Sequence, residues 1–405
     1  MSSPSHVPPT SRDEPRYRWA VLALGFLVIM TSIGFTRFAY TVIMPEMRRG
    51  LGLTYTDMGL IGTIGFGAYL LANLPAGTAA AYFGMRRTIA SALALAGAGL
   101  FGLALAPGFG VAALANALVQ ASSAAANVAG FAIVVPWFPV TQRGRAAGAV
   151  VGGAGLGIVL VGRLVPSLLT ADEAGWRYAW MAVGAATLLV GAITGACLRN
   201  HPAAALAERR RQSGTLVWTD LARRPTLWVL AFVMGLFGFE YIVFGTFFAA
   251  NLTARGWTID DAGSLWSVVG LLMIGSGLVG GALSDRIGRL PALGALFAAQ
   301  AAASLLFALT SDGLGLYAGV ALYGATVMGF PAVVGALCGD LVGPARASVA
   351  IAFTNVIFAL GQTIGPTVAG AVLDATGALQ GALFTGAASA LLGMVTCLIS
   401  ARVKH

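Results

Sequence analysis

The stretch Gly281-Ala-Leu-Ser-Asp285-Arg286-Ile-Gly288-Arg289 joins two long apolar runs and has a counterpart in the first half of the chain. The counterpart, Gly77-Thr-Ala-Ala-Ala-Tyr-Phe-Gly84-Met-Arg86, lies 204 residues earlier and has glycine at the same first and eighth positions. Gly34-Phe35 and Gly238-Phe239 repeat at the same offset. A repeat of this length, with apolar runs on both sides, indicates a duplicated unit of parallel topology.

The composition places that unit in a membrane. Charged residues make up 10% of the 405 residues and hydrophobic residues 58%, with a mean hydropathy of +0.84. Soluble chains carry about 25% charged residues, because water must cover their surface. The 55 glycines suit membrane helices whose backbones pack closely. We therefore predict an all-α membrane protein.

Apolar runs of about 20 residues, enough to span a bilayer, can be marked twelve times along the chain, six before and six after a polar segment. The fold predicted is two pseudo-symmetric six-helix bundles. The expected organisation is a disordered cytoplasmic N-terminus (1–18), the first bundle (19–198), a cytoplasmic linker (199–225), the second bundle (226–401) and a cytoplasmic tail (402–405). The predicted spans are 19–44, 58–80, 88–106, 111–140, 146–169, 178–198, 226–252, 262–284, 291–309, 314–337, 348–373 and 379–401.

The basic residues predict the orientation. Eighteen of the 24 Lys and Arg fall on the side that holds both termini and the linker, against four on the other side. Cytoplasmic loops carry such an excess, so both termini should be cytoplasmic, in the inner membrane of a bacterium. The net charge of +9 is then a topology signal, with no patch left over for nucleic acid.

Several kinds of chemistry lack their usual signatures. The cysteines show no CxxC spacing and the three histidines lie outside the apolar runs, so we expect no metal site and no cofactor. The sequence also lacks a phosphate-binding loop and a Gly-x-Ser-x-Gly elbow. We therefore expect neither an enzyme nor an ATP-driven pump.

The loop between the eighth and ninth runs, Gly281-x-Leu-Ser-Asp285-Arg286-x-Gly288-Arg289, resembles the signature of the major facilitator superfamily. Together with the six-plus-six pattern, the resemblance covers nearly the whole chain and implies alternating access by rocking of two bundles. A second set of residues is similar to the bacterial branch called YbfB/YjiJ-like, a likeness that does not fix a substrate. These residues are Arg37-Phe38-Ala39-Tyr40-Thr41, Pro45-x-Met47, Leu51-Gly52-Leu53 and Gly175-Trp176-Arg177.

The same loops are candidates for a conformational latch. Glycines let helix ends approach, and Asp285 can cap a helix or pair with arginines there. In the first half Ala81 takes the place of the aspartate, which departs from the superfamily pattern. The alternative is that the arginines only set topology. The predicted latch residues are Gly281, Asp285, Arg286, Gly288 and Arg289, with Gly84, Arg86 and Arg87 in the first half.

Three ionisable residues lie well inside predicted spans, where a charge costs on the order of 3 kcal/mol. Arg37, with Tyr40 three residues on, would face the central cavity if the resemblance holds, or else extend to the outer interface. Arg163 would bind substrate or form a structural pair, for example with Glu240. Glu240 would carry a coupling proton, form an ion pair or contact substrate.

Polar residues at matching spacing complete the predicted substrate site. Gln120 and Asn127 lie seven residues apart on the fourth span, and Asn355 and Gln362 repeat this spacing on the eleventh. Tyr241 corresponds to Arg37 by the repeat. The alternative for these residues is hydrogen bonding between helices.

The function predicted is secondary active transport of a small organic anion, a carboxylate, with possible coupling to protons. Two arginines against one glutamate leave the core at +1 if all are ionised, which favours an anion. The alternative is efflux of drugs or metabolites by a member of the same superfamily. A sensor or enzyme built on this scaffold is a third class, which the missing motifs make unattractive. We expect a monomer whose partners are a small-molecule substrate and the bilayer.

Overall fold

The computed structural model describes residues 14–139, 142–200, 223–310, 313–343 and 347–403. Within these ranges twelve helical segments are long and apolar enough to cross a membrane, which confirms the predicted all-α fold. The first half contains α1 (Glu14–Ile29), the π-helix η1 (Met30–Phe35), α2 (Thr36–Leu51), α3 (Tyr55–Phe83), α4 (Met85–Ala104), α5 (Phe109–Val134), the short 3-10 turn η2 (Val135–Trp137), α6 (Arg143–Leu169) and α7 (Gly175–Cys197). The second half contains α10 (Pro225–Ala254), α11 (Ile259–Ile287), α12 (Arg289–Leu309), α13 (Gly313–Thr326), α14 (Gly329–Val342), α15 (Ala347–Thr376) and α16 (Leu379–Val403).

Several boundaries differ from the sequence prediction. The first helix begins at Glu14, so residues 14–18 are helical where a disordered terminus was expected. The last helix continues to Val403, two residues beyond the predicted end at 401. Most of the predicted linker (201–222) and the terminal residues 1–13 and 404–405 lie outside the described residues.

Two predicted spans have internal breaks that hydropathy does not reveal. In the first span the π-helix η1 ends at Phe35, two residues before Arg37, and within it Gly34 packs on the backbone of Gly157. The tenth span is two helices, α13 and α14, separated at Val327 and Met328. The backbone N–H of Met328 donates to the Ser276 hydroxyl at 3.1 Å, which satisfies a group that the break frees.

The duplication extends to the local signals that begin and bend helices. Thr54 caps α3 by accepting from the backbone N–H of Asp57, and Thr258 caps α11 by accepting from Asp261, 204 residues later. Gly84 and Gly288, also 204 apart, have φ of +85° and +90°, which only glycine adopts without strain. Equivalent sequence positions therefore make equivalent turns in the two halves.

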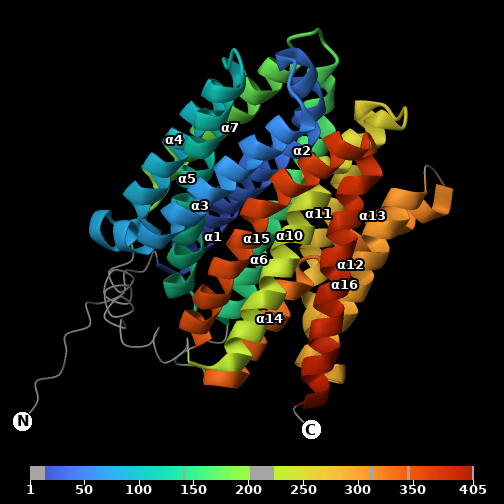
Figure 1. The fold of residues 1–405 in the computed structure, drawn as a ribbon. Helices are drawn as coiled ribbons and strands as arrows, with labels where there is room; N and C mark the ends of the chain where they lie inside the picture. Colours follow the sequence, from blue (N-terminus) through green and yellow to red (C-terminus); the bar gives the residue numbers. More distant parts are fainter. Residues whose placement is uncertain (1–13, 140–141, 201–222, 311–312, 344–346, 404–405) are drawn as a thin grey trace, which may run out of the picture.

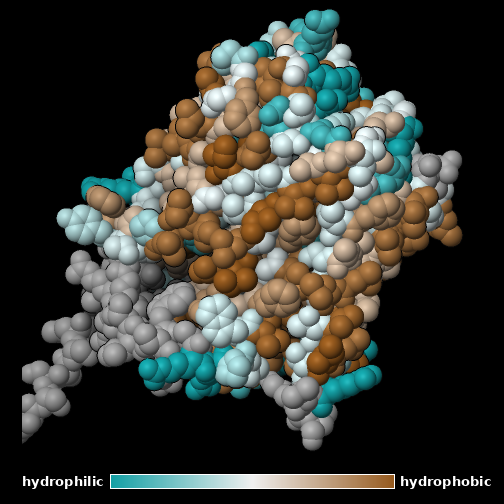
Figure 2. All heavy atoms as spheres, in the orientation of Figure 1, coloured by the Kyte–Doolittle hydropathy of each residue, from teal (hydrophilic) through white to brown (hydrophobic). Residues whose placement is uncertain are grey.

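The two halves lie against each other along three pairs of helices (Figure 1). Helix α6 packs on α11, and α3 packs on α15, while α2 meets α10 between these two pairs. Figure 2 shows apolar side chains across the middle of one face and hydrophilic residues gathered toward its ends, as expected of a lipid-covered surface. Leucines such as Leu71, Leu278 and Leu314 are among the exposed side chains.

The halves close at one end and separate at the other. We call the end that holds Arg86, Arg199 and Arg286 the arginine-rich end, and the other the opposite end. Toward the opposite end α6 and α11 touch backbone to backbone: a Cβ added at Gly162 or Gly155 would clash with α11 carbonyl groups. Helices α3 and α15 touch in the same way where Gly59 meets Pro366.

Hydrogen bonds between the halves follow the same pattern within the described residues. The backbone N–H of Thr56 donates to the Asp374 carboxylate at 2.7 Å, and the Thr63 hydroxyl donates to the Thr363 carbonyl at 2.6 Å. Toward the arginine-rich end an apolar cavity of about 680 Å³ opens instead. The residues that line it come from α1, α6 and α11: Trp19, Leu22, Ala23, Phe26, Leu27, Gly148, Ala149, Gly152, Leu156 and Ile274. The opposite end is thus sealed. Toward the arginine-rich end a cavity is open, lined by the first half and by Ile274 of the second.

Candidate functional site

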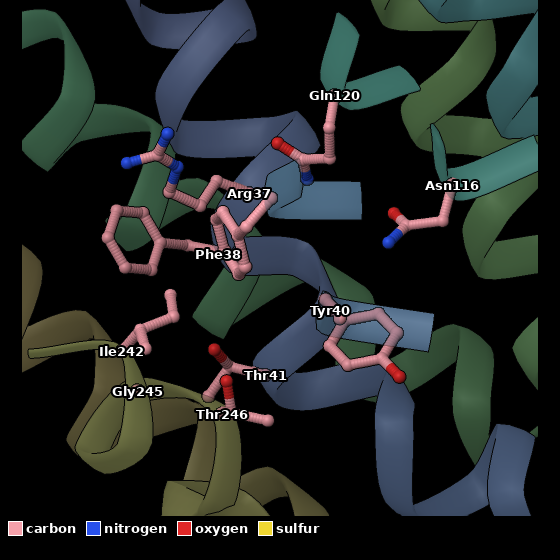
Figure 3. A pocket seen from close by; sticks show the side chains of 11 residues that line it. Arg37, Phe38, Tyr40, Thr41, Asn116, Gln120, Ile242, Gly245 and Thr246 are labelled. Carbon is pink, nitrogen blue, oxygen red and sulfur yellow. The ribbon is translucent and has the colours of Figure 1, made fainter. Parts of the chain in front are cut away.

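A small cavity with several polar side chains in its wall lies where the two halves meet at α2 and α10. Its volume is about 10 Å³, room for roughly one water molecule. Figure 3 shows Arg37 and Gln120 from the first half on one side and Thr246 of α10 on the other. The lining residues are Arg37, Phe38, Tyr40, Thr41, Gly62, Phe66, Asn116, Gln120, Ile242, Gly245 and Thr246.

Arg37 is the buried cation of this cavity, with 9% of its surface exposed. Its guanidinium carbon lies 5.2 Å from the centre of the Phe66 ring and 4.7 Å from that of Tyr69, so the two rings hold it by cation–π contact. Its Nε is buried and has no hydrogen-bond partner. In the part of the chain that the structure describes, no carboxylate lies within ion-pair distance of Arg37. A positive charge with an unused Nε donor therefore lies at the junction of the halves.

Polar neighbours of Arg37 divide into engaged and unengaged groups. The Tyr40 hydroxyl donates to the Met58 carbonyl at 2.7 Å, so it supports α3 rather than offering a free group to the cavity. The Gln120 amide nitrogen donates to the Thr36 carbonyl at 3.1 Å, whereas its Oε1 is buried without a partner. The Asn116 amide donates to the Ile61 carbonyl at 2.9 Å. Gln120 therefore keeps one free acceptor beside the cavity.

Asn127 and Tyr241 reach Arg37 through aromatic rings. The Asn127 amide donates to the Tyr69 hydroxyl at 2.9 Å, and Tyr69 in turn packs on the guanidinium. Tyr241 packs edge-on against Phe38, with ring centroids 5.9 Å apart, and its phenol lies near Arg37. Neither residue lines the cavity; both lie behind its wall, next to groups that contact Arg37.

Arg163, Asn355 and Gln362 lie outside the cavity, which the sequence prediction did not anticipate. The Arg163 side chain is exposed and donates to the Ser264 hydroxyl at 2.8 Å. Its position late in α6 brings it to the sealed end, where α6 packs on α11. Asn355 is exposed, while Gln362 is buried and its Nε2 has no partner. The seven-residue spacing on α15 therefore does not place both amides in one environment.

Glu240 is fully buried, and its side chain is directed away from the cavity. It accepts a hydrogen bond from the Ser304 hydroxyl of α12 at 3.3 Å, and its Oε2 has no partner. It pairs with neither Arg37 nor Arg163 within the described residues. Although the repeat gives helices α2 and α10 charges at similar depth, the face of α10 turned to the cavity carries Ile242, Gly245 and Thr246 instead.

The candidate latch forms a charged cluster inside the second half. Arg289 donates to Asp285 at 2.6 Å, to Asp340 at 3.1 Å and to the Ser284 hydroxyl at 2.7 Å. The cluster joins α11, α12 and α14, and a Cβ added at Gly281 would meet nothing, so that glycine faces open space. Asp340, at 3.1 Å from Arg289, brings α14 into the cluster.

In the first half the equivalent loop is held by hydrogen bonds to carbonyl and amide groups. The Arg86 guanidinium donates to the Gly195 carbonyl at 2.6 Å, and its backbone N–H donates to the Asn200 side chain at 2.9 Å. Arg87 and Arg286 are exposed. The first half has Ala81 where the second half has Asp285, and Arg86 bonds a carbonyl and an amide group instead of a carboxylate.

Residues that the sequence reasoning missed form most of the setting of Arg37. Phe66 and Tyr69 stand three residues apart on α3, a spacing that puts them on one helix face. Nothing in an apolar span distinguishes a ring that faces an arginine from one that faces lipid. Asn116 could have been found as a polar residue four positions before Gln120 on the same face of α5.

Comparisons with known proteins agree with this architecture. The profile of the Major Facilitator Superfamily matches residues 26–366 and also 253–404. The probable galactarate/D-glucarate transporter GudP of Bacillus subtilis is 24% identical over 94% of this chain and 91% of its own. The probable sulfoacetate transporter SauU of Cupriavidus necator is 25% identical over 71% of each chain. Among solved structures, the nucleoside transporter NupG superposes with a TM-score of 0.80 at 14% identity, over 94% of this chain and 99% of that one.

A bacterial homologue of the human lysosomal transporter Spinster superposes with a TM-score of 0.78 at 16% identity, over 97% of this chain and 98% of that one. The family profile spans most of the chain, and the twelve-span fold and the paired halves fit it. The chain belongs to the major facilitator superfamily and is a multi-pass membrane transporter.

Proposed function

We propose that this transporter moves a small organic anion, a carboxylate, by secondary active transport. The observation that carries the proposal is Arg37, a buried guanidinium between the halves that is held by two rings. No carboxylate in the described part of the chain lies within ion-pair distance of it. A buried charge without a counter-ion is costly, so a bound anion would stabilise it. The planar fork of donors suits a carboxylate.

The names of two relatives support an anionic substrate. Galactarate, D-glucarate and sulfoacetate are all anions, and the transporters named for them align with 71% or more of this chain. The motif around Arg37 is similar to the YbfB/YjiJ-like branch, which leaves the substrate open. Arg163 has no part in this site; Gln120 contributes its free acceptor, and Tyr241 and Asn127 position Arg37.

We further propose that the two halves rock about the cavity. If the arginine-rich end faces the cytoplasm of a bacterium, as the Lys and Arg distribution predicts, then the present structure is open inward and sealed outward. The groups that would be parted on outward opening include Thr56 and Asp374. One chain supplies both walls of the cavity, so a monomer suffices.

Glu240 is our candidate for the coupling proton. It is buried among uncharged groups, where the neutral carboxyl costs less than the carboxylate. Its separation from Arg37 leaves the arginine free for substrate while the proton binds elsewhere.

A second candidate function is efflux of apolar compounds. The apolar cavity of about 680 Å³ at the open end would admit a hydrophobic molecule, with Trp19 and Phe26 in its wall. Under this alternative Arg37 would have a structural role and would not bind substrate.

Substitution of Arg37 separates the two candidates. Arg37→Lys should weaken binding of a carboxylate roughly 10- to 100-fold, because losing a charge-assisted bond costs about 1.5–3 kcal/mol. Ligand-induced thermal stabilisation of the purified protein by a panel of carboxylates, sulfonates, nucleosides and hydrophobic cations would measure it. Arg49→Lys, an exposed arginine on the same helix, is the matched control. Stabilisation by hydrophobic cations alone, unaffected by Arg37→Lys, would instead establish efflux.

Glu240→Gln tests proton coupling separately. An amide cannot release a proton, so we expect binding and exchange of substrate to persist while pH-driven accumulation in proteoliposomes is lost. Ser389→Ala, which removes a hydroxyl that bonds the Leu236 carbonyl on the same helix α10, is the matched control for perturbed packing. Accumulation at the normal level in Glu240→Gln would remove this residue from the coupling mechanism.

A further inference from the structure

A cluster of buried polar groups surrounds Glu240 on the side of α10 that faces away from the cavity. Ser304 and Gln300 approach it from α12, and Tyr323 and Thr326 lie beyond them at the end of α13. Glu240, Gln300 and Ser304 are all at most 1% exposed. Polar groups buried this deeply need partners, so the possible hydrogen-bond arrangements can be enumerated.

The Gln300 amide can take two orientations of equal shape, and each gives a different set of bonds. With its nitrogen toward α13, that nitrogen donates to the Thr326 hydroxyl at 3.0 Å and to the Tyr323 carbonyl at 3.4 Å. Its oxygen then lies 3.2 Å from Oε1 of Glu240. Two oxygens at that separation need a hydrogen between them, and a protonated Glu240 supplies it. The Thr326 hydroxyl meanwhile donates to the Leu322 carbonyl at 2.6 Å.

With the amide reversed, the bonds suit an ionised Glu240. The Gln300 nitrogen donates to Oε1 of Glu240 at 3.2 Å, and its oxygen accepts from the Thr326 hydroxyl at 3.0 Å and the Val327 backbone N–H at 3.3 Å. A threonine hydroxyl has one hydrogen, so Thr326 must then release the Leu322 carbonyl. Proton loss at Glu240 is therefore matched by a half-turn of one amide and a change of bonding at Thr326 and Val327.

Thr326 and Val327 stand at the point where the tenth span breaks between α13 and α14. We infer that Glu240, Gln300 and Thr326 form a proton-dependent switch in which the Gln300 amide transmits the state of the carboxyl to the break in this span. The inference rests on the proposal that Glu240 carries the coupling proton. It adds Gln300 as the residue that transmits the protonation state of Glu240 to the break.

A second contact links the switch to the cavity. The Tyr323 hydroxyl donates to the Tyr241 carbonyl at 2.9 Å, and the Tyr241 ring packs on Phe38 beside Arg37. The end of α13 is therefore bonded both to the amide that responds to the proton and to the helix that bounds the substrate cavity.

The surroundings of Glu240 leave few competing groups. The titratable groups nearest to it are the phenols of Tyr323 and Tyr241, while α12 presents Gln300 and Ser304 and α16 presents Gly386. Within the described residues no arginine or lysine lies within ion-pair distance. A change of pH at this site would therefore act on the Glu240 carboxyl.

Infrared difference spectra of the wild-type protein in lipid, recorded between acid and alkaline pH, test the switch directly. We expect a carboxyl band that is missing in Glu240→Gln, and a side-chain amide band, missing in Gln300→Met, that changes over the same pH range. An amide band that ignores pH while the Glu240 band responds would overturn the switch and leave proton coupling intact. Bands that follow the concentration of Na⁺ rather than pH would overturn it in favour of a cation site.

Spin labels at cysteines replacing Leu314 and Ala332, on either side of the break, test the movement. The labelled positions are separated by roughly 27 Å at 1.5 Å per residue. In the wild-type background the distance should change with pH, and in Gln300→Met, which keeps the length of the side chain, it should not. A distance that still follows pH in Gln300→Met would show that Gln300 does not transmit the signal. If the infrared spectra of the wild type contained no carboxyl band from Glu240, the proposed proton site itself would be wrong.

Discussion

At the scale of single residues, the setting of Arg37 explains how a charge persists inside an apolar bundle. Phe66 and Tyr69 cover the guanidinium with ring faces, and the Asn127 amide bonds the Tyr69 hydroxyl from behind. Ring faces stabilise a cation without neutralising it, in contrast to a carboxylate partner. The arginine therefore keeps its charge, and its Nε donor, for a ligand.

Substitution of Tyr69 should separate the ring from its hydroxyl. Tyr69→Leu removes a cation–π contact worth about 0.5–1.5 kcal/mol, so carboxylate affinity should fall roughly 3- to 10-fold. Tyr69→Phe keeps the ring and should retain most of the affinity, while leaving the Asn127 amide unpaired at a cost of about 1 kcal/mol in stability. Binding isotherms and thermal unfolding measure the two effects, with the exposed Tyr82→Leu on the same helix as control. Equal affinities in Tyr69→Leu and wild type would contradict the positioning role.

At the scale of helices, glycines determine which ends of the bundle can close. Gly155 and Gly162 of α6 lie against Gly270 and Gly263 of α11, and each of these contacts involves a backbone carbonyl. Backbones approach this closely only where neither helix has a Cβ in the way. The seal at the opposite end therefore depends on these small residues as well as on hydrogen bonds such as that from Thr56 to Asp374.

Gly270→Leu should open this seal, because its side chain would collide with the Gly155 carbonyl and Ile158. A cysteine at Thr246 in the cavity should then react faster with an impermeant maleimide added from the opposite end. Gly275→Leu, on the same helix where an added Cβ meets nothing, is the matched control. If both variants label at the rate of the parent, the glycine contacts do not hold the seal.

At the scale of the whole molecule, only the membrane topology decides whether the sealed end or the open end faces the cytoplasm. The arginine-rich end holds the ends of α3, α7 and α11, and the distribution of Lys and Arg predicts that it is cytoplasmic. The inward-open assignment depends on this prediction. A labelling experiment therefore tests it.

Cysteines at Glu173, after α6, and at Arg286, near the end of α11, should label from opposite sides of the membrane. Both side chains are exposed, and the parent protein should lack Cys197, Cys338 and Cys397. In intact cells an impermeant maleimide should modify the Glu173 position and spare the Arg286 position until the cells are opened. Modification of the Arg286 position in intact cells would reverse the orientation and make the structure outward-open.

The sequence by itself determined the fold and the family, because both depend on patterns spread over the whole chain. Span length, the 204-residue repeat and the loop around Asp285 are read without knowing any contact. Arg37 could also be identified as a candidate, since an arginine in an apolar run is costly wherever it points.

Only the tertiary structure decided which polar residues share a site. Arg37 and Glu240 lie at similar depth, yet rotation about the helix axis turns one to the cavity and the other to Gln300 and Ser304. Arg163 likewise reaches Ser264, because helix packing, not span position, sets its neighbours. The position of a residue along a helix can be predicted from the sequence, whereas the direction of its side chain is determined only when the helices pack.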